Sequence, residues 1–183
     1  MLPIDIIKKY YPEDSLAYFY FYNHSVAVKE KAIEIANNNI DLKPDIDFIT
    51  SGAMLHDIGI IFTNAPQIGC FGTYNYICHG YLGRELLEKE GLSEIAKICE
   101  THIGVGLTVE DIEKDNLPIP NRDMLPTSIE EKIICVADKF YSKNMKQLTT
   151  PKSVEEIFKD IERFGKEKPL KLKEMFDLLK IKY

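Results

Sequence analysis

The sequence has 183 residues, of which 45% are hydrophobic and 28% are charged. These values are ordinary for a globular protein and allow one domain with a sizeable core. Lys and Arg together number 23 against 29 for Asp and Glu, so the formal net charge is -6. An acidic chain is poorly suited to holding an extended nucleic acid backbone, and we do not expect that kind of partner.

The N-terminal segment and the apolar runs argue against secretion or membrane insertion. The first residues lack the basic-then-apolar order of a signal peptide, and no apolar run reaches the ~20 residues that span a bilayer. The four cysteines form no CxxC pair and no zinc-finger spacing. We therefore expect a cytoplasmic protein without a membrane partner, whose cysteines are buried free thiols.

Helix signals follow one another along the chain, and strand signals are nearly absent. Ser15 and Asp45 can each cap a helix, because their side chains accept hydrogen bonds from free backbone N–H groups. Gly59 is expected to end the helix that follows Asp45. The predicted class is therefore all-α. The expected helices are Pro3–Tyr11, Ser15–Asn38, Asp45–Asp57, His79–Gly91, Ser93–His102, a short acidic helix after Thr108, Ile129–Tyr141, Ser153–Phe164 and Leu170–Ile181.

Two connections lack helical periodicity. The first, over residues 60–78, contains Gly, Pro and four aromatic residues, and a long aromatic loop in a compact domain favours an ordered cover over a site. The second contains three prolines and carries Arg122. Ser128 with Glu131 three residues later is a capping-box pattern, so the next helix is expected to begin there.

A set of histidines and aspartates is spread over these helices in a pattern typical of metal sites. Imidazole and carboxylate are ligands that first-row divalent cations accept. The set comprises all the histidines of the chain and two aspartates in apolar runs: His24, His56, Asp57, His79, His102 and Asp138. A single histidine or aspartate in a helix is more often a structural residue. Buried carboxylates, however, are rare unless they are paired or bound to a metal. Here all the histidines and two such aspartates fall on one pattern, which favours a metal site.

The adjacent His56 and Asp57 project about 100° apart on a helix, so they flank a site rather than share a face. A carboxylate has two oxygens, and Asp57 can bridge two cations about 3.5–4 Å apart. His24, His56 and Asp138 are then the other ligands of the first cation. His79 and His102 are the other ligands of the second cation. The sequence therefore predicts a binuclear metal centre.

This ordered set resembles the HD-domain superfamily of metal-dependent phosphohydrolases. The local sequence from His56 to Gly59 is similar to the HDIG subgroup, and the segment around Asp138 is similar to that subgroup's last motif. The resemblance covers about residues 20–145, followed by C-terminal helices at about 151–183, and we treat 1–183 as a single HD domain. It implies a compact helical bundle around two divalent ions: iron or manganese, or magnesium, zinc, nickel or cobalt.

The resemblance implies hydrolysis of a phosphate ester or phosphodiester, for example a nucleotide, by a metal-activated water, with Asp57 at the centre of catalysis. Gly59 is followed by Ile60-Ile61-Phe62 rather than Gly-Tyr-Pro, which argues against cyclic dinucleotides. Small phosphorylated molecules are the expected partners, and the chain is a candidate homo-oligomer. Four cations are candidates for binding substrate phosphate: Arg122 first, then Lys139, Lys143 and Arg84.

Two other functions fit the same six residues. One is a diiron oxygenase of the HD type, which would use O₂ and leave phosphate esters intact. The absence of an acidic residue at Leu16-Ala17, shortly before His24, favours hydrolysis over this reading. The other is a non-catalytic nucleotide-binding module whose metals only bind phosphate. Turnover of nucleotides by the metal-loaded protein separates this module from an enzyme.

Overall fold

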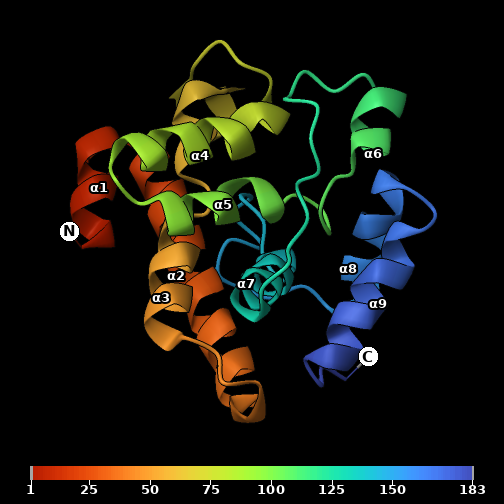
Figure 1. Cartoon of the computed structure of the whole chain (residues 1–183). Helices are drawn as coiled ribbons and strands as arrows, with labels where there is room; N and C mark the ends of the chain where they lie inside the picture. The colour runs from red at the N-terminus through yellow and green to blue at the C-terminus, as the bar shows by residue number, and fades with distance from the viewer. Residues whose placement is uncertain (1, 183) are drawn as a thin grey trace.

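The computed structural model describes residues 2–182 and confirms the all-α class. The described residues form nine α-helices and one pair of two-residue strands (Figure 1). The helices are α1 (Pro3–Tyr10), α2 (Leu16–Asn37), α3 (Ile46–Leu55), α4 (His79–Lys89), α5 (Ser93–Thr101), α6 (Val109–Lys114), α7 (Ile129–Lys139), α8 (Val154–Ile161) and α9 (Lys168–Leu178). None of these helices is long and apolar enough to cross a bilayer.

Between α3 and α4 the chain forms short helical turns and a small hairpin. Strands β1 (Asn64–Ala65) and β2 (Cys70–Phe71) pair antiparallel, with Asn64 opposite Phe71. The loop predicted over residues 60–78 is therefore ordered. Five 3₁₀ turns occur in the described chain: Ile40–Leu42, Ile58–Phe62, Pro66–Ile68, Tyr76–Cys78 and Glu162–Phe164.

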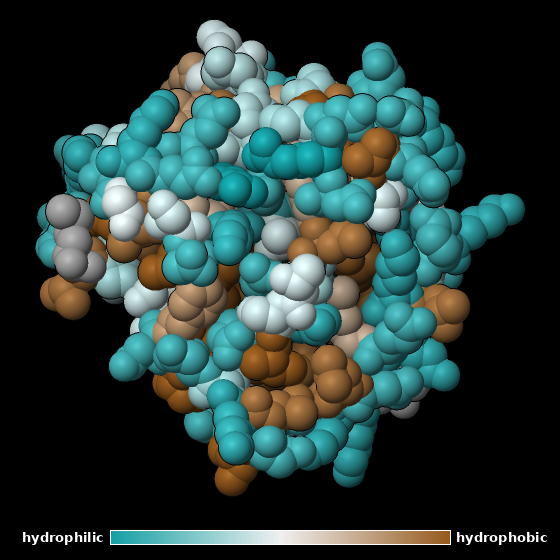
Figure 2. All heavy atoms as spheres, in the orientation of Figure 1, coloured by the Kyte–Doolittle hydropathy of each residue, from teal (hydrophilic) through white to brown (hydrophobic). Residues whose placement is uncertain are grey.

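Helix α7 lies at the centre of the molecule, and the other helices surround it (Figure 1). Helices α2 and α3 pack against each other and against α7, and the antiparallel pair α4 and α5 covers another side. The C-terminal helices α8 and α9 close the core, which contains buried residues from α2, α3, α7, α8 and α9. Hydrophilic side chains cover most of the face in Figure 2, with hydrophobic ones in separate patches among them.

Close approach of α3 to its neighbours depends on Gly52. A Cβ at this position would lie 2.3 Å from Cδ1 of Ile98 and 2.9 Å from Cδ1 of Ile134. The small residue therefore lets α5 and α7 pack directly against α3. These are the helices whose ends carry His102 and Asp138, so this contact also sets the spacing of the site.

The predicted helix starts are confirmed by their caps. Ser15, Asp45 and Ser128 each accept a hydrogen bond from the backbone N–H three residues later. The last helix begins at Lys168 rather than Leu170. Pro169 lies in its first turn, where the missing N–H of proline has no intrahelical partner to lose.

The predicted role of Gly59 as a helix terminator is wrong. Helix α3 ends earlier, at Leu55, and Gly59 lies inside the 3₁₀ turn Ile58–Phe62. A Cβ on Gly59 would lie 2.1 Å from the carbonyl oxygen of His79 and 2.4 Å from the backbone nitrogen of Gly83. The glycine is required because α4 crosses directly over the turn that follows Asp57.

Candidate metal centre

Six side chains from five helices or helix ends meet in the interior. His24 lies in the middle of α2, and Asp138 lies in the last turn of α7. His56 and Asp57 follow the end of α3, His79 opens α4, and His102 follows α5. All except Asp138, which is partly exposed, are buried. The structure therefore brings together the whole set of residues that the sequence predicts as ligands.

One group forms around Oδ2 of Asp57. Nε2 of His56 lies 3.0 Å from this oxygen, and Nε2 of His24 lies 3.2 Å from it. The Oδ1 atom of Asp138 completes the group at 3.0 Å from His24 Nε2 and 3.5 Å from His56 Nε2. These four residues offer ligand atoms within 4.8 Å of one another and could hold a metal ion.

A second group forms around the other oxygen of the same carboxylate. Asp57 Oδ1 lies 3.3 Å from Nε2 of His79 and 3.4 Å from Nε2 of His102. The two imidazole Nε2 atoms lie 3.2 Å apart. These three residues also could hold a metal ion. Asp57 thus belongs to both groups, with one carboxylate oxygen facing each.

Backbone carbonyls orient three of the imidazoles. Nδ1 of His56 lies 2.7 Å from the carbonyl oxygen of Ala53, and Nδ1 of His79 lies 2.6 Å from that of Tyr76. Nδ1 of His102 lies 3.2 Å from the carbonyl oxygen of Ile98. A carbonyl accepts a hydrogen bond, so the N–H belongs on Nδ1 in each ring. The Nε2 lone pair then points inward, as in metal-binding histidines.

The inward atoms fit a cation. Nε2 of His56 and both carboxylate oxygens of Asp57 are buried and make no hydrogen bond, although Oδ2 forms an ion pair with Lys143. Lone pairs facing one another at these distances repel unless positive charge lies between them. The ammonium of Lys143 already stands beside Oδ2 of Asp57 as a cation in this position. The donor set of imidazoles and carboxylates suits first-row divalent ions.

The buried charges of the site shift the pKa values of its residues. Burial raises the pKa of Asp57, but Lys143 and His56 outweigh burial and lower this pKa well below its usual range. Burial lowers the pKa of His79 to about 4, so its imidazole is neutral at neutral pH. Burial also opposes charge on His56, yet the carboxylates of Asp57 and Asp138 raise its pKa to about 9. A metal ion binding there would displace that proton.

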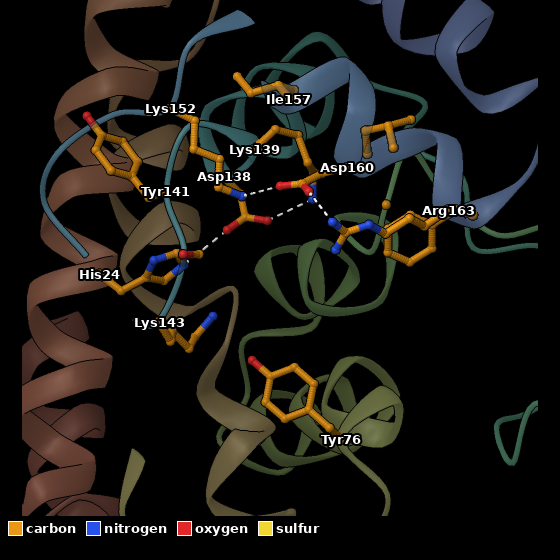
Figure 3. Close-up of a pocket in the computed structure, with 14 residues that line it drawn as sticks. His24, Tyr76, Asp138, Lys139, Tyr141, Lys143, Lys152, Ile157, Asp160 and Arg163 are labelled. Carbon is orange, nitrogen blue, oxygen red and sulfur yellow. Dashed lines mark hydrogen bonds and ion pairs between the residues drawn. The ribbon is translucent and has the colours of Figure 1, made fainter. Parts of the chain in front are cut away.

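A cavity of about 520 Å³ borders the six residues at His24 and Asp138 (Figure 3). Tyr76, from the 3₁₀ turn before α4, lies on one side of the cavity, with Lys143 beside His24. Four cationic side chains and two acidic ones are among the described residues that line it. A cavity of this size, with net positive charge at its wall, suits an anionic small molecule.

Two of the four predicted substrate-binding cations line this cavity. Lys139 donates to Oδ2 of Asp138 at 2.7 Å and to the carbonyl oxygen of His102 at 2.8 Å. It therefore joins the two segments that carry Asp138 and His102. Lys143 lines the cavity and forms an ion pair with Asp57.

Arg84 and Arg122 lie elsewhere, around a buried carboxylate. The guanidinium of Arg84 pairs with Oε1 of Glu100, and Nη2 of Arg122 lies 2.8 Å from Oε2 of the same residue. Glu100 is 2% exposed. Neither arginine is among the residues that line the cavity beside Asp138. Their roles as substrate ligands stay predictions, while their observed contacts join α4, α5 and the proline-rich loop.

The HD-domain family profile matches residues 21–142 of this chain, which include all six inward-facing residues. The chain belongs to the HD-domain family. No solved structure gives a match to this HD domain. Three curated proteins that it resembles differ in length.

An uncharacterised protein of Methanocaldococcus jannaschii is 35% identical over 150 residues, covering 80% of this HD-domain chain and 78% of that protein. A tRNA (cytidine(56)-2'-O)-methyltransferase of Thermoplasma volcanium is 34% identical over 140 residues. A protein of the same name from Picrophilus torridus is 36% identical over 125 residues. The match to the Thermoplasma volcanium protein covers 76% of this chain and 35% of that protein. The match to the Picrophilus torridus protein covers 65% of this chain and 33% of that protein.

Sequence reasoning missed several residues that the structure places at the cavity. Lys152, Asp160 and Arg163 line it from the C-terminal segment. In the sequence they are ordinary charged residues of an amphipathic helix and its flanks, with no motif around them. Glu100 was also missed, although its place two residues before His102 in a buried helical turn was a usable signal.

Proposed function

We propose that this HD domain is a metal-dependent phosphohydrolase that holds two divalent cations and hydrolyses a phosphate ester or phosphodiester. The observation that carries this proposal is the position of Asp57, whose two oxygens each face a separate group of imidazoles. A carboxylate shared in this way suits a bridging ligand between two cations. Iron, manganese and other first-row ions are all compatible with the donor set.

Bound cations would supply an acidified water and offset negative charge on the phosphoryl oxygens. The chain's own residues hold and orient the substrate. Lys143, which lines the cavity and reaches Asp57, can pair with a phosphate oxygen. Lys139 is bound to Asp138 and to the carbonyl of His102, so it holds the ligands in place. We propose Lys143 as the substrate cation and Lys139 as a positioning residue.

The basic cavity favours hydrolysis over oxygen chemistry. Phosphate esters carry negative charge and need cations at the wall of the site, whereas O₂ activation does not. Two relatives bear the name of a tRNA methyltransferase, and this chain spans only about a third of each. For this chain we propose the chemistry that its own side chains support. Because those relatives are named for a reaction on tRNA, ribonucleotides belong among the substrates to be tested.

The test is phosphate release from a panel of phosphomonoesters and phosphodiesters, including nucleotides. Anaerobically purified protein is stripped with a chelator and then supplied with Fe²⁺, Mn²⁺, Mg²⁺, Zn²⁺, Ni²⁺ or Co²⁺ in turn. We expect hydrolysis that disappears on chelation, returns with at least one metal and is lost in Asp57→Ala. Metal-loaded protein that consumes O₂ without releasing phosphate would replace this proposal with the oxygenase. Nucleotide binding without either reaction would replace it with the binding module.

A further inference from the structure

The wall of the cavity opposite the ligand-bearing helices comes from a segment beyond the family match. Residues 152–164 supply six of the fourteen described residues that line the cavity, whereas the HD-domain profile ends at residue 142. The metal ligands thus lie in the part shared with the family. The far wall belongs to a C-terminal segment that folds back over the site.

This far wall carries a compact charged group. Nζ of Lys152 lies 3.0 Å from Oδ2 of Asp160, and Nη2 of Arg163 lies 3.2 Å from Oδ1 of the same carboxylate. One carboxylate between two cations leaves a net charge of one positive unit. Figure 3 shows this group at the side of the cavity opposite Tyr76. The Lys152 side chain is 11% exposed, so its charge is only weakly screened by solvent.

The cavity also has room for more than one phosphate. Its volume of about 520 Å³ is far above that of a phosphate ion and falls within the ~300–1,000 Å³ of small-molecule sites. Ile157, Ile161 and Phe164 provide an apolar stretch of wall next to the charged group. A polar groove of about 530 Å³ shares Lys152 and Arg163 with the cavity and continues past them.

We infer that Lys152 and Arg163 form a second anion subsite, which selects substrates carrying another phosphate or carboxylate besides the phosphate at the metal centre. A nucleoside bisphosphate has this chemistry: two phosphates on one ribose, with an aromatic base whose face can pack against an apolar wall. Asp160 holds both cations in place, and each retains N–H groups to donate to an incoming anion. The inference rests on the proposed function for the location of the first phosphate, and it adds the substrate class.

The experiment measures binding rather than turnover, with adenosine 5'-phosphate and adenosine 3',5'-bisphosphate as probes. Metal-loaded protein is titrated with each nucleotide by calorimetry, and chromatography afterwards confirms that the nucleotide is intact. We expect wild-type protein to bind the bisphosphate about tenfold more tightly than the monophosphate. Lys152→Gln and Arg163→Gln should each remove most of that preference, while leaving the affinity for the monophosphate within about twofold.

Lys166→Gln is the matched control, because Lys166 is an exposed lysine just beyond this segment and does not line the cavity or the groove. It should preserve the preference for the bisphosphate. Arg163 is 73% exposed, so Arg163→Gln decides the question if Lys152→Gln unfolds. Equal affinity of wild-type protein for both probes would overturn the inference. So would an equal weakening of both probes in the variants, which would indicate a general electrostatic effect.

The failure of this inference is distinguishable from the failure of the proposed function. Phosphate release is measured separately on the same preparations. If binding prefers the bisphosphate through Lys152 and Arg163 but no hydrolysis occurs, the subsite is supported and the hydrolase proposal is rejected. Hydrolysis without such a preference keeps the hydrolase and rejects the subsite.

Discussion

At the residue scale, Lys143 links the metal centre to the cavity. Its ammonium pairs with Asp57. Burial lowers the pKa of this lysine, but Asp57, Tyr76 and Asp138 outweigh burial and raise the pKa. The charge is therefore permanent at neutral pH and available to a substrate phosphate. Because Lys143 is not among the six inward-facing residues proposed as metal ligands, its loss should affect substrate binding more than metal binding.

We predict that Lys143→Gln lowers kcat/KM by about 10- to 1,000-fold while the metal content stays unchanged. Steady-state phosphate release and elemental analysis of the same samples measure the two effects. Lys146→Gln provides the control, because Lys146 is an exposed lysine of the same loop and does not line the cavity. Unchanged kcat/KM in Lys143→Gln would remove Lys143 from the substrate site.

The residue scale also shows what sequence can and cannot supply. The meeting of the six residues was predictable because every histidine of the chain belongs to the set, and because Asp57 and Asp138 interrupt apolar runs. The partners of an arginine were not predictable. Arg122 was expected to reach the site from its loop, yet its guanidinium pairs with Glu100. Such a pairing depends on the position of a loop in three dimensions, which spacing along the chain does not encode.

At the element scale, Tyr11 at the C-terminal end of α1 holds the turn that follows Asp57. The hydroxyl of Tyr11 donates to the carbonyl oxygen of Ile58 at 2.8 Å and accepts from the backbone N–H of Ile61 at 3.0 Å. Tyr11 is fully buried and stacks on Phe21 with ring centroids 4.4 Å apart. The C-cap residue of the first helix therefore fixes the backbone immediately after Asp57.

We predict that Tyr11→Phe lowers the free energy of unfolding by about 1–3 kcal/mol, because a buried carbonyl and a buried N–H lose their partner. Metal affinity should fall as well, since the turn after Asp57 loosens. Chemical denaturation and metal titration measure the two effects. In Tyr10→Phe, a control on the same helix, the lost bond is to the side chain of Glu90, so metal affinity should not change. Wild-type metal affinity in Tyr11→Phe would refute this coupling.

Helix starts were predictable from local chemistry, whereas one helix end was not. Ser15, Asp45 and Ser128 cap helices through contacts three residues away, which are visible in the sequence. Gly59 looked like a terminator for the same local reason. Its actual role is to admit the backbone of α4, a contact with residues about twenty positions away. A glycine signals either role, and only the packed structure separates them.

At the scale of the whole molecule, a buried ion pair fastens the C-terminal helices to the HD-domain core. Lys168, at the start of α9, is fully buried, pairs with Asp111 of α6 and donates to the carbonyl oxygen of Gly106 at 3.1 Å. Burial raises the pKa of Asp111, but Lys168 and Thr108 outweigh it and lower this pKa to about 2. The pair therefore stabilises the fold only while Asp111 is ionised.

We predict that Asp111→Asn destabilises the protein by about 3 kcal/mol at neutral pH, because it leaves the Lys168 charge buried without its partner. A depressed folded pKa contributes stability above the unfolded value, and this contribution is lost as pH falls through the folded pKa. The difference between wild type and Asp111→Asn should thus shrink from about pH 5 down to about pH 2. Urea denaturation in the presence of chelator measures it. A difference that stays constant with pH would contradict the assignment.

The far wall of the cavity belongs to this scale too, and the sequence did not predict it. Two helices after residue 150 were expected from their amphipathic pattern, and α8 and α9 confirm them. Nothing in that pattern indicates that Lys152 and Arg163 return to the vicinity of Asp138. The return depends on how α8 and α9 pack against α7, which is a long-range contact.

The measurement that tests the central claim most directly is the metal content of wild-type protein, His79→Ala and Asp57→Ala. Wild type should bind two ions per chain, since Asp57 faces two separate ligand groups. His79→Ala removes a ligand from one group and should retain one ion, whereas Asp57→Ala removes the shared ligand and should retain none. Elemental analysis after anaerobic purification gives these numbers. Equal metal content in wild type and His79→Ala, or two ions in Asp57→Ala, would contradict a centre bridged by Asp57.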